Sequence, residues 1–138
     1  MASSFRILLV EDNADDEHLT LRALRNLGDE VELEVARDGQ LALDRILNPS
    51  APLINLILLD LHLPKVSGIE VLNAVRSDAA TSEIPVVVLT SFEEPDDIKA
   101  SYQRHANSYI KKPVSREEFA SVVQKLGIYW HDINVKPG

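Results

Sequence analysis

The chain has 138 residues, and 45% of them are apolar, which is enough for one domain with a sizeable hydrophobic core. Its 22 acidic residues outnumber 14 Lys and Arg, and the resulting net charge of -8 disfavours binding to nucleic acid or to an anionic membrane. The absence of cysteine excludes disulfides and cysteine-ligated zinc. Neither a membrane-spanning apolar run nor a signal peptide is recognisable, so we expect a cytoplasmic protein.

Patterns typical of strands and helices alternate five times along the chain. Short apolar runs bounded by turn residues predict the strands, and apolar residues at i, i+3, i+4 and i+7 predict the helices. In chain order, the predicted elements are strand 6–10, helix 14–27, strand 30–35, helix 40–47, strand 56–59, helix 68–75, strand 86–89, helix 95–105, strand 108–111 and helix 115–126.

Local signals support several of these elements. Asn13 is placed to cap the first helix, the acidic residues 15–17 suit its positive end, and Gly28 can close it. In the second strand, apolar residues alternate with glutamates. This alternation predicts a strand with one exposed side at the edge of the sheet.

The strands at 6–10, 56–59 and 86–89 are continuous apolar runs, as expected for parallel strands covered by helices on both faces. The fold class is therefore α/β, a (βα)5 doubly wound sheet of five parallel strands. Ligands of such sheets bind at the carboxyl ends of the strands. The chemically capable residues expected at that end are Glu11, Asp12, Asp60, Thr90 and Lys112.

Three of these residues are carboxylates that would converge on one edge of the sheet. Converging carboxylates need a cation, and Mg²⁺ prefers oxygen ligands. Taken singly, each residue has an ordinary explanation as a helix cap, a turn residue, a strand end or part of a loop. The ordered set favours a site.

Several short motifs follow the strands in a fixed order. They are Glu11-Asp12, Asp60 with Pro64 and Gly68, Thr90-Ser91, Tyr109, and Lys112-Pro113. Together they resemble the receiver domain of two-component response regulators, over about residues 5–126. The resemblance implies a flavodoxin-like receiver fold with strand order 2-1-3-4-5 in residues 1–127, followed by a C-terminal extension at 128–138. Further similarity to single-domain receivers paired with bacterial phytochrome kinases rests on Asn13-Ala14-Asp15-Asp16, Leu63-Pro64-Lys65 and Tyr129-Trp130.

This resemblance implies that the chain is a stand-alone response regulator and not an enzyme. Asp60 would accept a phosphoryl group from a sensor histidine kinase, and the narrower similarity suggests a phytochrome as that kinase. The signal would pass on by conformational change or by relay to a phosphotransfer protein. Neither nucleic acid nor a membrane is expected as a partner.

The residues around Asp60 acquire roles from the same resemblance. Lys112 and the Thr90 hydroxyl would contact phosphoryl oxygens, and the Lys112–Pro113 bond would be cis. The His62 side chain should face solvent, outside the metal shell. Mg²⁺ is the expected cofactor, with Mn²⁺ or Ca²⁺ as substitutes, and its expected ligands are Glu11, Asp12, Asp60 and the backbone carbonyl of His62.

Two further pairs of residues are predicted to control the response. Thr90 and Tyr109 form the expected switch, in which Tyr109 turns inward when Thr90 moves toward the phosphoryl group. The alternative is that Tyr109 only packs. His62 and Phe92 occupy the positions that tune dephosphorylation, and since Phe92 cannot hydrogen-bond an attacking water, we expect slow self-dephosphorylation.

The extension at 128–138 carries Tyr129 and Trp130 beyond the last predicted helix. Exposed apolar extensions tend to bind a partner, so we expect a homodimer in which this arm packs on the neighbour's face formed by the helices at 95–105 and 115–126. The alternative is that the extension folds back on its own subunit.

Three rival functions fit only part of this residue pattern. A Mg-dependent phosphatase with an Asp nucleophile uses similar residues, but its nucleophile follows the first strand and its acidic pair comes last. A flavodoxin-like electron carrier needs a phosphate-binding first loop, and the acidic residues of 11–16 would repel phosphate. A structural adaptor would not need the complete set of site residues.

Overall fold

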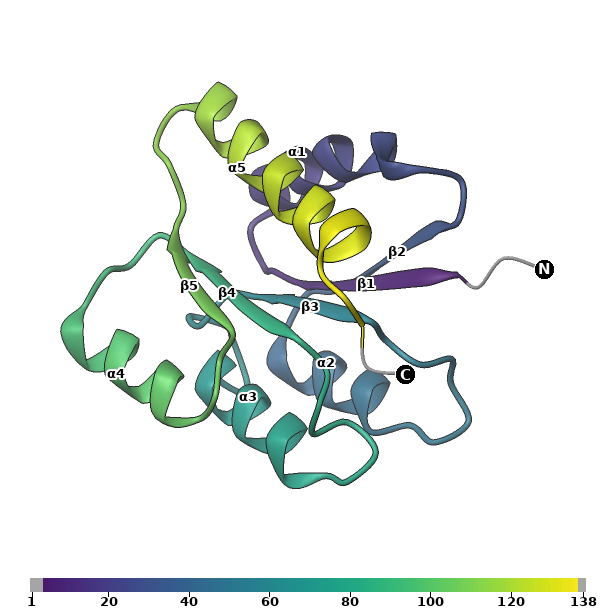
Figure 1. The fold of residues 1–138 in the computed structure, drawn as a ribbon. Coiled ribbons are helices and arrows are strands. Elements are labelled where there is room, and N and C mark those ends of the chain that lie inside the picture. The colour runs from purple at the N-terminus through teal and green to yellow at the C-terminus, as the bar shows by residue number, and fades with distance from the viewer. Residues whose placement is uncertain (1–3, 137–138) are drawn as a thin grey trace.

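The computed structural model describes residues 4–136, which build a five-stranded sheet between two layers of helices (Figure 1). All neighbouring strands are parallel, and their order is 2-1-3-4-5 as predicted. The strands are β1 (Phe5–Val10), β2 (Val31–Ala36), β3 (Leu56–Leu59), β4 (Val86–Thr90) and β5 (Ser108–Lys111).

Both faces of the sheet are covered. Helices α1 (Ala14–Leu24) and α5 (Arg116–Ile128) lie on one face, and α2 (Gly39–Ile46), α3 (Gly68–Ser77) and α4 (Pro95–Gln103) lie on the other (Figure 1). Successive side chains of a strand point to opposite faces, so each buried strand contributes to two hydrophobic clusters. In β3, for example, Ile57 and Leu59 belong to the cluster of α2 and α3, and Leu56 and Leu58 to that of α1 and α5.

Side-chain caps fix where the helices begin. Asn13 accepts a hydrogen bond from the Asp16 amide and starts α1 as predicted, and Asp38, Ser67 and Ser115 cap α2, α3 and α5 in the same way. The helix ends differ more from the predictions. The last residues of the predicted helix 14–27 form a separate 3-10 turn, and α5 runs two residues beyond the predicted limit at 126.

Strand β2 pairs only with β1 and is an edge strand, as its glutamate pattern predicted. The glutamates are held by arginines. Arg6 contacts both Glu32 and Glu34, and Arg45 Nε lies 2.6 Å from Glu34 Oε1. The hydrogen bond from Arg45 lowers the pKa of Glu34, which keeps this edge charged and unsuited to further strand pairing.

The C-terminal extension continues from α5 as a π-helical turn, Tyr129–Ile133, and folds back on its own subunit. Trp130 is buried in the cluster of α1 and α5, and His131 Nε2 lies 3.0 Å from Glu30 Oε1 near β2. Residues 1–3 and 137–138, at the ends of the predicted segments 1–127 and 128–138, lie outside the described residues. Trp130 thus follows the alternative prediction, in which the extension folds back on its own subunit. The homodimer stays a prediction.

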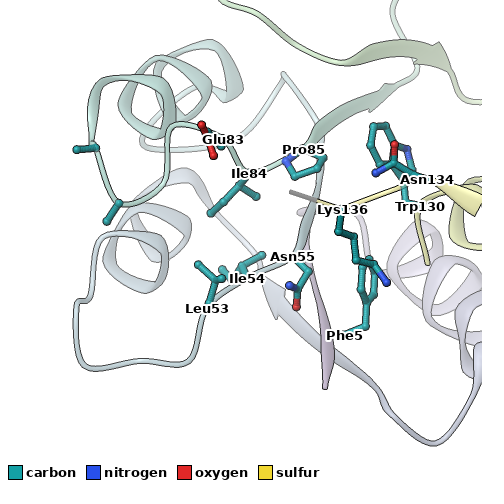
Figure 2. A pocket seen from close by; sticks show the side chains of 12 residues that line it. Phe5, Leu53, Ile54, Asn55, Glu83, Ile84, Pro85, Trp130, Asn134 and Lys136 are labelled. Atoms are coloured by element: carbon teal, nitrogen blue, oxygen red, sulfur yellow. The ribbon is translucent and has the colours of Figure 1, made fainter. Parts of the chain in front are cut away.

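A cavity of about 290 Å³ separates this tail from the loops before β3 and β4. Figure 2 shows Trp130, Asn134 and Lys136 on one side of it, with Leu53, Ile54 and Ile84 across from them. It lies at the amino-terminal end of the sheet, because these loops enter β3 and β4. The predicted site lies at the other end.

None of the helices within 4–136 combines the length and apolar character that a bilayer crossing requires.

Candidate functional site at the carboxyl edge of the sheet

The predicted carboxylates meet where β1 and β3 end. Val10 pairs with Leu59 in the sheet, so Glu11 and Asp60 leave neighbouring strands at the same level. One oxygen each from Glu11, Asp12 and Asp60 lies within 4.8 Å of the others. Three carboxylate oxygens at this separation fit a hard divalent cation such as Mg²⁺ or Mn²⁺.

Close backbone packing holds Asp60 in place. Its amide donates to the Val10 carbonyl at 3.1 Å, and the His62 amide donates to Asp60 Oδ1 at 3.2 Å. Helix α3 starts directly behind it, because the Gly68 amide donates to the Leu61 carbonyl at 2.8 Å. A Cβ at Gly68 would lie 2.3 Å from the Asp60 carbonyl oxygen, so only glycine allows this approach.

Lys112 reaches this cluster from the end of β5. Its ammonium donates to Glu11 Oε1 at 2.6 Å, Asp16 Oδ2 at 2.8 Å and Asp60 Oδ2 at 3.0 Å. All three protons of the ammonium are thereby used. The side chains of Lys112 and Glu11 are only 4% and 2% exposed, so these ion pairs are shielded from water.

Protonation at the site reflects one ammonium facing several carboxylates. Burial raises the pKa of Glu11 to about 7, because Lys112 offsets only part of the cost of a buried charge. Burial alone would lower the pKa of Lys112, but the hydrogen bonds to Asp16 and Glu11 outweigh it and raise that pKa. Lys112 is therefore charged at neutral pH, and Glu11 is poised between its two forms.

Thr90 stands at the end of β4, beside Lys111 of β5. It is completely buried, and the Lys112 amide donates to its carbonyl at 2.7 Å. Within residues 4–136, its hydroxyl is one of a few buried side-chain polar atoms without a hydrogen-bond partner. An unpaired buried hydroxyl costs about 1–3 kcal/mol, so a ligand oxygen placed there would be bound favourably.

Phe92 joins the loop after β4 to two other parts of the site. The Tyr109 hydroxyl donates to the Phe92 carbonyl at 2.8 Å, and burial followed by the charge of Asp97 raises the pKa of Tyr109 to about 12. The His62 ring centroid lies 3.9 Å from that of Phe92, and His62 Nε2 is 3.2 Å from Asp97 Oδ2. The His62 side chain was predicted to face solvent. It is 48% exposed, and its ring also contacts the Phe92 ring and the Asp97 carboxylate of α4.

One prediction about Lys112 is wrong, and one of its partners was not predicted. No cis peptide bond occurs in residues 4–136, so the prediction of a cis Lys112–Pro113 bond is wrong. The lysine side chain spans the distance to the carboxylates from a trans bond. Sequence reasoning also missed Asp16, which it treated only as an acidic residue suited to the positive end of α1. The sequence pattern gives no sign that this carboxylate would bind a lysine 96 positions away.

Comparison with known proteins decides the family. The family described as response regulator receiver domain matches residues 7–124. The chain belongs to this receiver family. Receivers of this kind bind a divalent metal, and the cluster of Glu11, Asp12 and Asp60 matches that property. The predicted resemblance is therefore confirmed.

Two sequence relatives align along nearly their whole length with this receiver. The probable methanogenesis regulatory protein FilR2 of Methanothrix harundinacea is 42% identical over 137 residues, covering 97% of this chain and 88% of FilR2. Response regulator Rcp1 of Synechocystis is 38% identical over 128 residues, covering 90% of this chain and 87% of Rcp1.

Solved structures of two cyanobacterial proteins share the fold. The phosphorylated phytochrome response regulator RcpA superimposes with a TM-score of 0.94 at 36% identity, covering 99% of this chain and 100% of RcpA. The Mn²⁺-bound form of Rcp1 gives a TM-score of 0.92 at 36% identity, covering 97% and 99%. This receiver is thus related to phytochrome response regulators.

Metal binding to this receiver should depend on pH through Glu11. The raised pKa means that the metal-free folded protein keeps a proton on Glu11 below about pH 7, and a cation must displace it. Affinity for Mg²⁺ should therefore rise with pH and level off above 7, with a dissociation constant at pH 6 about tenfold weaker than at pH 8.

Isothermal titration calorimetry at both pH values measures this difference, and two buffers of different ionisation enthalpy reveal the released proton. The Glu11→Gln protein serves as the control and should lose most of the pH dependence. Equal dissociation constants at pH 6 and pH 8 for the unaltered protein would contradict the assignment.

Proposed function

We propose that this chain is a stand-alone response regulator in the cytoplasm that accepts a phosphoryl group on Asp60 from a sensor histidine kinase. One observation carries the proposal. The Asp60 carboxylate belongs to a cluster able to bind a divalent cation and also lies 3.0 Å from the Lys112 ammonium. Positive charge from a cation and from Lys112 would offset the negative charge of the phosphoryl group that this carboxylate attacks.

The transfer uses these residues in defined roles. An Asp60 oxygen attacks phosphorus, the bond between phosphorus and the kinase histidine nitrogen breaks, and the bonding electron pair stays on that nitrogen. Glu11, Asp12, Asp60 and the His62 backbone carbonyl would hold a divalent cation, proposed as Mg²⁺, which would offset negative charge on the phosphoryl oxygens. Lys112 and the unpaired Thr90 hydroxyl bind further phosphoryl oxygens. The protein is a phosphoacceptor and not an enzyme acting on other substrates.

The proposed donor is a phytochrome kinase, which rests on the similarity to RcpA and Rcp1. FilR2, whose printed name concerns methanogenesis, is related at a similar level. The output is therefore proposed only as protein contact or as relay to a histidine phosphotransfer protein. Phosphotransfer profiling against purified kinases would identify the donor.

Acetyl phosphate should phosphorylate the protein once, on Asp60, when Mg²⁺ is present. The expected intact mass gains one phosphoryl group in the unaltered protein and none in Asp60→Asn, because an amide oxygen is not an adequate nucleophile. Asp44→Asn, at an exposed position on α2, is the matched control and should label normally. Labelling that persists in Asp60→Asn would contradict the assignment, and continuous phosphate release without a stable adduct would indicate the Mg-dependent phosphatase.

The proposed output is a conformational switch through Thr90 and Tyr109. Movement of the Thr90 hydroxyl toward a phosphoryl oxygen would vacate space beside β4, and Tyr109 would fill it. The bond from Tyr109 to the Phe92 carbonyl supports this, because it fixes the ring in the half-buried position from which it would leave. The face of α4, β5 and α5 would change with it.

Phosphorylated Asp60 should lose its phosphoryl group slowly, because Phe92, whose ring contacts that of His62, cannot hydrogen-bond an attacking water. Replacing Phe92 by Glu should accelerate dephosphorylation about tenfold, since a carboxylate can position an attacking water through proton transfer. Phosphate release after removal of acetyl phosphate measures the rate. Phe92→Leu, which keeps an apolar side chain, should remain slow, and an unchanged rate in Phe92→Glu would contradict the role.

We also propose that the chain forms a homodimer through the face of α4 to α5 and its tail. A groove of about 310 Å³ between β5 and α5 is lined by Ile110, Val122 and Leu126, and Tyr129 of the tail borders it. Tyr129 is 45% exposed next to the buried Trp130. A second copy of this chain would cover this apolar strip.

Substituting Tyr129 by Ser should shift the sedimentation mass from dimer toward monomer, because it removes an exposed ring from the proposed interface. Truncation after Gly127 is a poorer test, since it also removes Trp130 from the core. Val114→Ser, at a fully exposed apolar position in the loop before α5, is the matched control. An unchanged mass for Tyr129→Ser would contradict the interface.

A further inference from the structure

Asp16 contacts the centre of the site without belonging to the metal cluster. Its carboxylate Oδ2 lies 2.8 Å from Lys112 Nζ, while the oxygens that converge for a cation come from Glu11, Asp12 and Asp60. In the proposed phosphorylation of Asp60, Asp16 binds neither the cation nor the phosphoryl group. Its close contact with Lys112 therefore needs a separate explanation.

The backbone of Asp16 is fixed by the first turn of α1. Its amide donates to Asn13 Oδ1 at 2.9 Å, and its carbonyl accepts from the Thr20 hydroxyl at 2.7 Å. The Asp16 carboxylate is partly exposed, and its Oδ2 contacts Lys112 Nζ. The helix thus presents a fixed negative charge to the lysine.

The other two partners of Lys112 are metal-ligand candidates. A divalent cation on Glu11 and Asp60 neutralises their charge and repels the ammonium, which weakens two of its three bonds. Asp16 lies outside the cluster and is not neutralised. It is the carboxylate that still attracts Lys112 once the cation is bound.

We propose that Asp16 is a positioning residue that holds the Lys112 ammonium beside Asp60 while a divalent cation occupies the site. The inference rests on the proposed role of Asp60 as phosphoacceptor. Lys112 binds a phosphoryl oxygen only if it stays next to Asp60, and Asp16 keeps it there through the contact between Asp16 Oδ2 and Lys112 Nζ. Asp16 acts through Lys112 and contacts neither the cation nor the phosphoryl group.

Asp16→Asn should slow phosphorylation by acetyl phosphate about tenfold at saturating Mg²⁺, because the amide keeps the size of the side chain and removes the charge that holds Lys112. Asp15→Asn is the matched control, with the same charge change in the same helical turn and an exposed side chain. It should stay within about twofold of the unaltered protein. Equal rates for Asp16→Asn and Asp15→Asn would overturn the proposal.

A double-mutant cycle separates positioning from a general effect on charge or folding. In a Lys112→Met background, Asp16→Asn should have no further effect on the rate, since the residue through which it acts is gone. Asp16→Glu retains the charge and should restore part of the rate. A tenfold loss that persists in Lys112→Met, or an absence of rescue by Asp16→Glu, would overturn the proposal.

A second readout does not depend on phosphotransfer. In the Mg²⁺-loaded protein, the Lys112 ammonium should give a slowly exchanging ¹⁵N-detected NMR signal that is lost in Asp16→Asn and retained in Asp15→Asn. If the unaltered protein fails to be labelled on Asp60, the proposed function fails, while the NMR signal still decides whether Asp16 holds Lys112. A signal that is unchanged in Asp16→Asn would exclude that role.

Discussion

The buried ammonium of Lys112 ties together the parts of the chain that form the site. Its three hydrogen bonds connect the ends of β1 and β3 and the first turn of α1 to the end of β5. Removing one partner of a buried ion pair typically costs about 3–5 kcal/mol, because a charge is left without compensation. The site is therefore a constraint on the fold as well as a place for chemistry.

The charges in this arrangement are not fully balanced. One ammonium faces Glu11, Asp16 and Asp60, so the cluster carries excess negative charge that a divalent cation can neutralise. The unpaired Thr90 hydroxyl and the raised pKa of Glu11 are two further features for which a bound phosphoryl group and cation would compensate. A cation would neutralise the excess carboxylate charge, and a phosphoryl group would accept a hydrogen bond from the Thr90 hydroxyl. Because these ligands would bind differently to different conformations of the surrounding loops, their binding would shift the loops.

Much of this could be predicted from the sequence, because the signals are local or follow from topology. Apolar runs identified the buried strands, and glutamate alternation identified the edge strand β2. Since parallel strands end at one edge, Asp60 and Lys112 could be placed together without a structure. The family match then confirmed the predicted resemblance to receiver domains.

The remaining features depend on tertiary geometry that local patterns do not carry. The pairing of Asp16 with Lys112 depends on the rotation of α1 about its axis, and a predicted helix leaves this rotation undefined. Trp130 lies four residues beyond the predicted end of the last helix, so the prediction placed it in an extension and not in the core that it fills. The contact of His62 with Phe92 and Asp97 joins two loops whose conformations are set by the sheet.

The most direct test is a crystal structure of the protein with Mg²⁺ and beryllofluoride, which mimics an aspartyl phosphate. We expect beryllium bonded to an Asp60 oxygen, with Lys112 and Thr90 contacting its fluorides, and the Tyr109 hydroxyl released from the Phe92 carbonyl. Beryllofluoride bound away from Asp60, or bound there without contact to Lys112 and Thr90, would contradict this account of the site.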